Sequence, residues 1–373
     1  MGFLLGLTYC CLWYSSILAG YVVLFCPLLP LLLISNKNYR KMTDIVFAIW
    51  QTYPTALLEI LCKCDIQITG DYVSSKETSL LIMNHRTRTD WNFLWPALHH
   101  AITGENNPSY PTKFVLKDSI RHIPGPGWVM QLACFTYLKR DWMIDKERIK
   151  NVLDYFIDLS YKFSMMIFPE GTDFTPKTKK LSDKYAEKNN LEKYDYVLHP
   201  RTTGFTYIAS RLLKTNSLDA IYDVTIAYCD TIPQTELDIL KGNFPKMIKI
   251  HFTRFPSDIL PKTKDGLNSF LKERWESKER ILKEFFNSGN FLHGKTLRYP
   301  HSDCVKYISL AFWGMMPGLA TYLLMENHFY RHMVVSHTFF LVFLNVFGIG
   351  FQSVEINLYN LKKVFWGIFK MFH

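Results

Sequence analysis

Residues 79–95 read SLLIMNHRTRTDWNFLW, and this stretch bears on the fold class and on the candidate chemistry together. SLLIM at 79–83 is a short apolar run of strand-compatible residues, which predicts a buried β-strand. DWNFLW at 90–95 starts with an acid, and an acid is favoured at the N-terminus of a helix. We therefore predict a strand, a polar loop and a helix that begins at Asp90.

Further apolar runs of strand length occur within the central part of the chain, MMIF at 165–168 and AIYDVTIAY at 220–228. Between such runs, residues 145–163 carry apolar side chains at helical spacing. Alternating strands and helices predict an α/β domain with a mostly parallel central sheet flanked by helices. Ligands of such sheets bind at the C-terminal ends of the strands. The charged stretch 264–285 is expected to form a surface helix whose segment KERWESKER faces solvent.

His85 and Asp90, at the HX4D spacing, lie between the first strand and its helix. A histidine can act as a general base on a hydroxyl, and a carboxylate can fix its tautomer and stabilise the imidazolium. Five residues turn a helix well past one full turn, so a loop must fold back to join the two. We predict that His85 and Asp90 are catalytic and that Asn84 supports them.

FPEGT, residues 168–172, follows another apolar strand. Its composition favours a tight turn in which Gly171 lets the backbone approach a ligand and N–H groups hold an anion. Glu170 either binds a hydroxyl or anchors the loop, and Pro169 and Thr172 shape the turn. An ordinary β-turn with a solvated acid is the alternative interpretation.

Two cations end strand-like segments: Lys117 follows KFVL, and Arg140 ends YLKR. Each could hold a phosphate, and the arginine could do so bidentately. The alternative is that both are ordinary surface charges.

The segment VLHPRTTGF, residues 197–205, combines turn formers with two basic side chains. Pro200 and Gly204 are expected to shape a turn. His199 and Arg201 are either ligand contacts or residues at the entry to a helix, and the sequence does not separate these interpretations.

The N-terminal residues 3–34 carry no charged side chain, and about 20 apolar residues suffice to span a bilayer. A signal peptide needs a positive start and a short apolar core, and neither is present, so we predict an uncleaved anchor. It is expected to tilt, or to bend at Pro27 and Pro30. Basic residues within 37–41 place the following chain on the cytosolic side. Residues 43–62 are predicted to form an interfacial helix.

Two further apolar runs, 304–325 and 333–351, are joined by ENHFYRH and predict a hairpin of two spans. Lysines after the second run agree with a cytosolic tail and a luminal N-terminus. Buried core helices of a soluble domain are the alternative. The chain is thereby divided into an anchor with an interfacial helix, a central α/β domain, and a hairpin with a basic tail: residues 1–62, 63–300 and 301–373.

The composition points to an anionic partner, because the formal net charge is +10. Nucleic acid is the weaker candidate, since no zinc-finger, basic-leucine or RNA-binding aromatic motif occurs. The eight cysteines form no CxxC pair and no disulfide-like framework, which fits a reducing compartment. The sequence leaves the oligomeric state open.

The four motifs, in this order, resemble those of the glycerophospholipid acyltransferase family. They stand here at Asn84–Asp90, Phe135–Arg140, Phe168–Thr172 and Val197–Gly204. The segments NHRTRTDW, IFPEGTD and VLHPRTTGF are similar to the motifs of the lysocardiolipin and lysophosphatidylinositol acyltransferase branch.

The resemblance implies a mechanism and a set of partners. His85, oriented by Asp90, would take the proton from a lysophospholipid's free hydroxyl, whose oxygen attacks the thioester of acyl-CoA. Lys117, Arg140 and the turn at 170–172 would bind the lipid phosphate. Acyl-CoA would be a co-substrate, with no metal or other cofactor. The resemblance also implies the endoplasmic reticulum membrane, with the catalytic domain in the cytosol.

One residue departs from the family pattern, because Asp173 stands where many members have arginine after EGT. Losing a cation there argues against a dianionic monoester such as lysophosphatidic acid, and favours a phosphodiester such as lysophosphatidylinositol or lysocardiolipin. Lysophosphatidic acid remains the alternative substrate.

Two rival classes stay open at this point. Fragments such as His99–His100 and the His328–His332 pair resemble the histidine boxes of di-iron membrane oxidases, which need about eight clustered ligands. A non-catalytic membrane lipid-binding protein would keep the apolar segments without needing His85 or Asp90.

Overall fold

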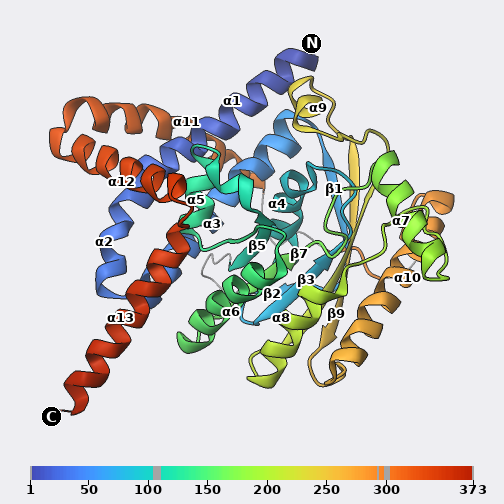
Figure 1. The fold of residues 1–373 in the computed structure, drawn as a ribbon. Coiled ribbons are helices and arrows are strands. Elements are labelled where there is room, and N and C mark those ends of the chain that lie inside the picture. The colour runs from blue at the N-terminus through green and yellow to red at the C-terminus, as the bar shows by residue number, and fades with distance from the viewer. Residues whose placement is uncertain (1, 104–110, 292–293, 298–302, 372–373) are drawn as a thin grey trace. The chain divides into compact units, whose positions relative to one another are not determined.

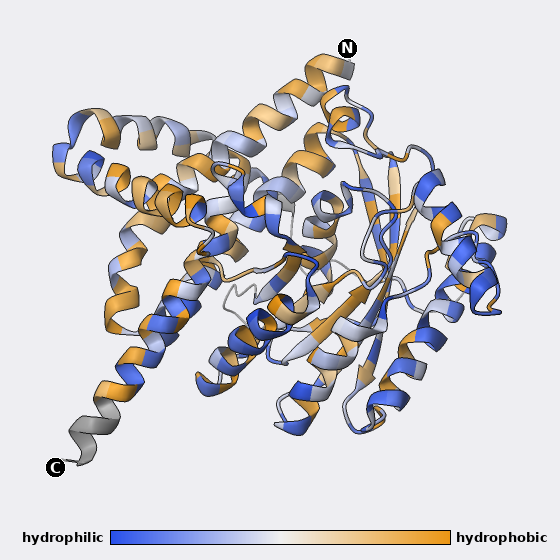
Figure 2. Ribbon diagram, in the orientation of Figure 1, coloured by the Kyte–Doolittle hydropathy of each residue, from blue (hydrophilic) through white to orange (hydrophobic). Residues whose placement is uncertain are grey.

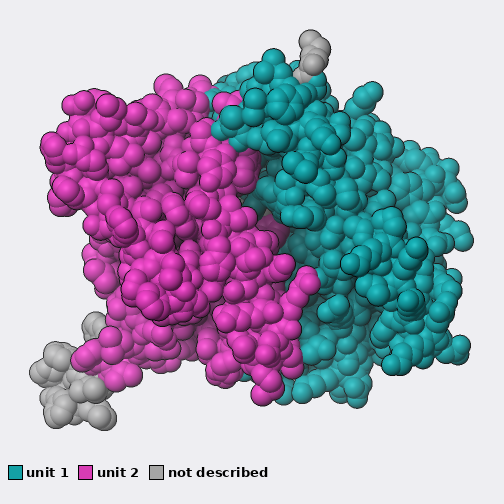
Figure 3. Space-filling view, turned by 45° about the horizontal axis from the view of Figure 1, so that its top comes forward, with its two compact units in different colours: residues 1–11, 51–107, 163–310 teal, residues 12–50, 108–162, 311–373 magenta. Residues whose placement is uncertain are grey.

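The structure, a computed structural model, describes residues 2–103, 111–291, 294–297 and 303–371. It contains two compact units, coloured separately in Figure 3. Unit 1 comprises residues 1–11, 51–107 and 163–310, and unit 2 comprises residues 12–50, 108–162 and 311–373. The domain boundary expected between residues 300 and 301 lies outside the described residues.

Five strands of unit 1 lie side by side in the order β1-β9-β8-β3-β7 (Figure 1). Three neighbouring pairs, β1 with β9, β8 with β3 and β3 with β7, are parallel, and β8 with β9 is antiparallel. The predicted α/β class with a mostly parallel sheet is confirmed. The strand bounds are β1 Asp65–Gly70, β3 Ser79–Met83, β7 Ser164–Ile167, β8 Ala220–Tyr228 and β9 Met247–Pro256.

The central strands read as continuous apolar runs because both faces of the sheet are covered. All residues of β3 and β8 are buried. Successive side chains of β8 point to opposite faces. Thr225 meets Lys278 of helix α10 (Lys264–Ser288), whereas Tyr228 packs on Phe93 of helix α4 (Asp90–Ala101). Figure 2 shows these strands as largely hydrophobic and α10 as mixed.

The remaining elements of unit 1 connect the sheet strands. A two-stranded parallel pair joins β2 to β4. Helix α7 starts with a capping box at Thr175 and Thr178, which satisfies backbone donors of its first turn. The bounds are η2 Leu57–Leu61, β2 Val73–Ser74, β4 Ile102–Thr103, α7 Pro176–Lys188, α8 Thr202–Lys214 and α9 Glu236–Leu240.

Helix α10 corrects one expectation, because part of KERWESKER is not solvated. Trp275 and Lys278 are both fully buried. Lys278 forms an ion pair with Asp223 and donates to the backbone oxygen of Val224 at 2.6 Å and to the hydroxyl of Thr225 at 3.2 Å. A buried charge costs several kcal/mol unless it is paired and hydrogen-bonded, and these three partners supply that compensation.

Unit 2 contains the parallel strand pair β5 and β6 and the helices around it. Helix α6 corresponds to the predicted helix within 145–163, and Asp141 caps it by accepting from the backbone N–H of Met143. The bounds are η1 Tyr21–Phe25, α2 Cys26–Ile34, β5 Thr112–Lys117, η3 Asp118–His122, α5 Pro126–Leu132, β6 Thr136–Leu138, α6 Trp142–Asp158, α12 His328–Val346 and α13 Phe351–Met371.

A buried ion pair joins α13 to the N-terminal part of unit 2. Arg40 Nε lies 2.8 Å from Glu355 Oε1, and both side chains are fully buried. Tyr155 of α6 donates its hydroxyl to the same carboxylate oxygen at 2.6 Å. Arg40 belongs to helix α3 (Asn36–Ala56), so one cluster ties three helices together.

Apolar helices are present at both ends of the chain, as predicted. Among the described residues, two helices are long and apolar enough to cross a membrane. They are Gly2–Ile34, which joins α1 (Gly2–Gly20) to η1 and α2, and Cys304–Glu326 within α11 (Asp303–Glu326). The π-helical turn η1 immediately precedes α2, where Pro27 lacks a backbone N–H. Large apolar side chains such as Phe312 on α11 are exposed, as lipid contact requires.

The second C-terminal run differs from one straight span. Helix α12 starts at His328, so that Asn327 alone separates it from α11 instead of the whole ENHFYRH segment. It ends at Val346, and after a break that includes Gly348 at φ 72° the chain continues as α13. The two helices are bent by 100° and pass the length and hydropathy test together, as a broken span or a re-entrant loop does.

Candidate functional site

His85 and Asp90 lie together at the C-terminal end of β3. Helix α4 begins at Asp90, as predicted. The loop folds back so that His85 Nδ1 lies 2.9 Å from Asp90 Oδ2. Because a carboxylate only accepts, Nδ1 donates and the free Nε2 is left as the basic nitrogen. The His85 side chain is 21% exposed and Asp90 is fully buried, so a substrate can reach only the histidine.

The Asp90 carboxylate is held by three donors besides His85. Thr87 donates its backbone N–H to Oδ2 and its hydroxyl to Oδ1, both at 3.1 Å. Tyr228, the last residue of β8, donates its hydroxyl to Oδ1 at 2.7 Å. These donors fix the orientation of the carboxylate beside the imidazole.

Burial of His85 by itself lowers the pKa of the imidazole, but the hydrogen bond and negative charge of Asp90 outweigh that effect. Carboxylates of Glu170 and Asp173 act in the same direction, and the pKa of His85 lies above its usual value. A raised pKa makes the neutral imidazole a stronger base, which suits proton abstraction from a hydroxyl.

The Tyr228 hydroxyl can be tested without removing a catalytic group. We expect Tyr228→Phe to lower kcat roughly ten-fold, because one charge-assisted hydrogen bond to Asp90 is lost. Tyr222→Phe is the matched control, since Tyr222 lies on the same strand and donates to Glu77 instead. Steady-state kinetics of both variants check this, and an equal loss in both would contradict a specific effect at Asp90.

Asn84 supports the loop by joining it to β8. Its amide nitrogen donates to the backbone oxygen of Ile226 at 3.2 Å, and its amide oxygen accepts from the N–H of the same residue at 2.9 Å. Asn84 thus continues the β3–β8 ladder by one side chain and fixes where the loop starts.

The FPEGT segment forms a turn directly beside His85. Phe168 packs its ring on the imidazole with centroids 4.5 Å apart. The N–H of Gly171 donates to the carbonyl of Phe168 at 2.9 Å, and Gly171 adopts φ 73°, where a residue with a side chain is strained. Thr172 and Asp173 follow, partly exposed. The turn therefore reaches the same strand edge as the histidine.

Glu170 points inward and is buried, so the interpretation as a solvated acid is wrong. Trp275 of α10 donates its indole N–H to Glu170 Oε1 at 3.2 Å. Burial raises the pKa of Glu170 to about 7, although the charge of His85 and the bond from Trp275 both favour the carboxylate. This geometry corresponds to the predicted role of Glu170 as an anchor of the loop.

The fourth motif joins the FPEGT turn through the backbone. Arg201 donates its N–H to the carbonyl of Pro169 at 2.8 Å and is the N-cap residue of α8. Its exposed side chain lies against Gly171. Gly204 lies inside α8, so it does not shape a turn, and Pro200 alone remains in the loop. His199 bonds to the backbone of Glu192 and stacks on the ring of Tyr194.

Lys117 and Arg140 belong to unit 2. Lys117 is the last residue of β5 and pairs in register with Leu138, two residues before Arg140. Both side chains are exposed, and Arg140 adopts φ 66°. The two cations therefore emerge at the same end of this strand pair, and their binding of a phosphate remains a prediction.

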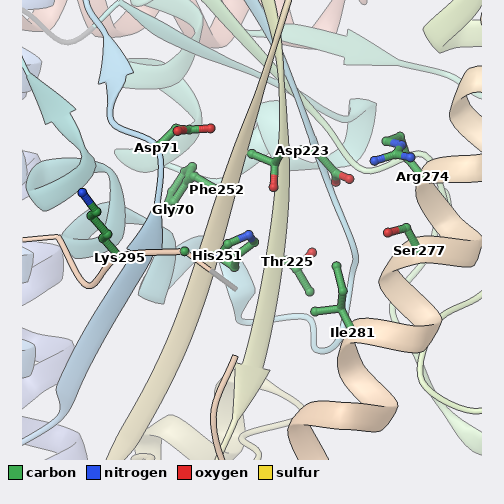
Figure 4. Close-up of a pocket in the computed structure, with 12 residues that line it drawn as sticks. Gly70, Asp71, Asp223, Thr225, His251, Phe252, Arg274, Ser277, Ile281 and Lys295 are labelled. Atoms are coloured by element: carbon green, nitrogen blue, oxygen red, sulfur yellow. The ribbon is translucent and has the colours of Figure 1, made fainter. Parts of the chain in front are cut away.

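Two of the cavities formed by the described residues lie within unit 1. The smaller, of about 240 Å³, is lined by Asn84 and Arg86 of the first motif together with Tyr196, Ile226, Tyr228 and Phe286. The larger, of about 460 Å³, lies between the sheet and α10 and is lined by residues such as Asp223, His251, Arg274 and Lys295 (Figure 4). His85 and Asp90 do not line the larger cavity, so the chemistry and not the volume identifies the site.

His100, one of the histidines of the rival oxidase interpretation, is engaged in an ion pair. His100 is buried and bonds through Nε2 to Glu59, which also pairs with Lys306 at 2.7 Å. Among the residues that the structure describes, no group of three or more His, Cys, Asp or Glu side chains is placed to hold a metal ion.

Three contributors to this site escaped sequence reasoning: Thr87, Tyr228 and Trp275. Tyr228 carried a usable signal, because it is a polar residue at the C-terminal end of a predicted strand. Trp275 carried another, since it continues an apolar stripe at helical spacing through a charged segment, with Leu267, Leu271, Leu282 and Phe285.

Comparisons with known proteins give consistent matches. Residues 65–229 match the family model described as acyltransferase, and residues 238–313 match the acyltransferase C-terminus. The chain is 41% identical to lysocardiolipin acyltransferase 1 of Gallus gallus, over 92% of each chain. It is 32% identical to lysophosphatidylinositol acyltransferase 10 of Caenorhabditis elegans, over 94% of this chain and 89% of that protein. The crystal structure of the 1-acyl-sn-glycerophosphate acyltransferase PlsC from Thermotoga maritima is matched with a TM-score of 0.47 at 15% identity, over 76% of this chain and 95% of that one.

Proposed function

Because the chain belongs to the glycerophospholipid acyltransferase family, we propose that His85 and Asp90 transfer a fatty acyl group from acyl-CoA to a lysophospholipid. The chain is an O-acyltransferase that re-acylates lysophospholipids. The single observation that supports this chemistry at His85 is its 2.9 Å bond to the buried Asp90, which leaves Nε2 as the basic nitrogen of a partly exposed side chain.

In the proposed reaction, His85 Nε2 accepts the proton of the lipid hydroxyl while the oxygen attacks the thioester carbonyl. The tetrahedral intermediate collapses, the carbon–sulfur bond breaks, and the imidazolium returns its proton to the departing thiolate of CoA. Asp90 stabilises the imidazolium between these steps. Both substrates are held at once and no acyl-enzyme forms, so positioning supplies much of the acceleration.

The lipid phosphate is proposed to bind to Lys117, Arg140 and the turn of Glu170, Gly171 and Thr172. The exposed guanidinium of Arg201, which lies against Gly171, adds a cation at that turn. Glu170 would act through its position in the loop, because it is buried against Trp275. No metal ion takes part in this proposal.

The head group is proposed to be inositol phosphate or that of lysocardiolipin, as in the named relatives. Asp173 supports a phosphodiester, since it places an acid beside the turn, where it accepts from Gln234 at 3.1 Å. Lysophosphatidic acid is the second candidate, because relatives named 1-acyl-sn-glycerol-3-phosphate acyltransferases also match.

Assays of purified protein on lysophosphatidylinositol, lysocardiolipin and lysophosphatidic acid test the head group. We expect kcat/KM for one of the two phosphodiesters to exceed that for lysophosphatidic acid by about ten-fold or more. Asp173→Arg should narrow this gap by adding a cation for the monoester, whereas Asp258→Arg, at an exposed aspartate outside the motifs, should not. A preference of the unaltered protein for lysophosphatidic acid would contradict the proposal.

The chain is a membrane protein by its apolar helices. We place it in the endoplasmic reticulum membrane, with the catalytic residues on the cytosolic side, where acyl-CoA would reach them. The basic residues that flank the apolar segments support this orientation through the positive-inside rule.

A further inference from the structure

Helix α10 contributes a buried side chain, Trp275, that contacts the FPEGT turn. Trp275 is fully buried, and its indole N–H donates to Glu170 Oε1 at 3.2 Å. A buried tryptophan usually finds one such acceptor, and here the acceptor belongs to the turn beside His85. The backbone of that turn continues directly into Gly171 and Thr172.

The position of Trp275 on α10 is fixed by a neighbour one helical turn away. Lys278 pairs with Asp223 and donates to the backbone of Val224 and the hydroxyl of Thr225, all on β8. Since β8 also ends in Tyr228, which donates to Asp90, the same strand supports both the catalytic carboxylate and the helix that holds Glu170.

The charge state of Glu170 is sensitive to its surroundings. Burial raises the pKa of Glu170 to about 7, so that near neutral pH both forms are populated. The charged groups that face it are His85 after β3, Arg86 in the same loop and Lys278 on α10, and all three favour the carboxylate when protonated. Trp275 favours the carboxylate too, because its N–H can donate to the ionised oxygen.

We propose that Trp275 is a positioning residue for acyl transfer, whose indole N–H holds the Glu170 carboxylate and thereby the phosphate-binding geometry of the Glu170–Gly171–Thr172 turn. The inference rests on the proposed function and deepens it at the same site. Trp275 is fully buried, so its effect on the substrate is exerted through Glu170. A tryptophan that only filled the core would affect stability and leave substrate binding unchanged.

Kinetics of Trp275→Phe on the full chain in detergent or vesicles test this inference. We expect KM for the lysophospholipid to rise about ten-fold, with a smaller change in kcat, because one hydrogen bond to a charged group is lost. Loss of the N–H raises the pKa of Glu170 further, so the defect should be larger near about pH 6 than near about pH 9. Trp275→Tyr, which keeps a donor, should recover part of the activity.

A double-mutant cycle separates this role from packing. Glu170→Gln removes the negative charge to which Trp275 donates. Adding Trp275→Phe to this variant should therefore raise KM by less than about a further two-fold. Phe285→Leu is the matched control, because Phe285 is buried on the same helix and packs on Phe286 and Phe291. It should lower thermal stability while leaving KM and the pH profile unchanged.

Several outcomes would overturn the inference: a defect of equal size in the Glu170→Gln background, a defect independent of pH, or a Phe285→Leu variant that behaves as Trp275→Phe does. If Trp275→Phe does not accumulate, the pH–rate profile of Glu170→Gln is measured instead. Its acidic side should report one ionisation where that of the unaltered protein reports two, because Glu170 no longer titrates. An unaltered protein without acyl transfer would instead contradict the proposed function.

Discussion

Replacing His85 with alanine is expected to lower kcat/KM for acyl transfer about a thousand-fold. The variant loses the imidazole that is proposed to act as the base for the lipid hydroxyl. Asp90 stays in place, because Thr87 and Tyr228 still donate to it, so the loop should keep its shape. Product formation from radiolabelled acyl-CoA, followed to the detection limit, measures the residual rate.

The matched control for this variant is His199→Ala. His199 belongs to the fourth motif, but it stacks on Tyr194 and bonds to the backbone of Glu192. It should keep acyl transfer within a few-fold of the unaltered rate. Both variants should remain membrane-bound with similar thermal transitions. If His85→Ala keeps full activity, the chemistry proposed for His85 is wrong. A non-catalytic lipid-binding role would then be favoured for the motif.

Removing the Glu355 carboxylate is expected to produce the largest loss of stability. In Glu355→Ala, Arg40 is left as an uncompensated buried cation, and breaking one partner of such a pair costs about 3–5 kcal/mol. Tyr155 also loses the acceptor of its hydroxyl. The midpoint of thermal unfolding in detergent should fall well below that of the unaltered protein, while any folded fraction keeps its KM.

The double variant Arg40→Met with Glu355→Leu provides the control. Apolar residues of similar volume remove both charges, and such replacements are often neutral or stabilising. The double variant should therefore be more stable than Glu355→Ala. If the double variant is less stable than Glu355→Ala, the two side chains stabilise the fold by more than the neutralisation of each other's charge.

The parts of the fold that could be read from the sequence are those set by local patterns. β3 and β8 coincide with SLLIM and AIYDVTIAY, because a strand buried on both faces must be apolar throughout. The start of α4 at Asp90 followed from the preference of acids for helix N-termini. The ordered motifs gave the family, and the structure brings His85, Asp90 and the FPEGT turn to one edge.

The parts that could not be read depend on partners far away in the chain. Lys278 was assigned to solvent because lysine is almost never fully buried unless it is paired. Its partner Asp223 lies on β8, and no pattern within the sequence of α10 predicts the pair. Tyr228 is likewise separated from Asp90 by most of the domain. The 100° bend between α12 and α13 is a change of backbone direction, which hydropathy does not describe.

The burial of α10 against β8 bears on how this enzyme can be recombined with its relatives. The two family matches meet between residues 229 and 238, which invites a cut there when substrate preferences are exchanged. Such a chimera would pair one parent's Asp223 and Glu170 with the other parent's Lys278 and Trp275. Crossover points that keep β7 through α10 in one parental block preserve those pairs, so the unit to be inherited intact is strands β7, β8 and β9 together with helix α10.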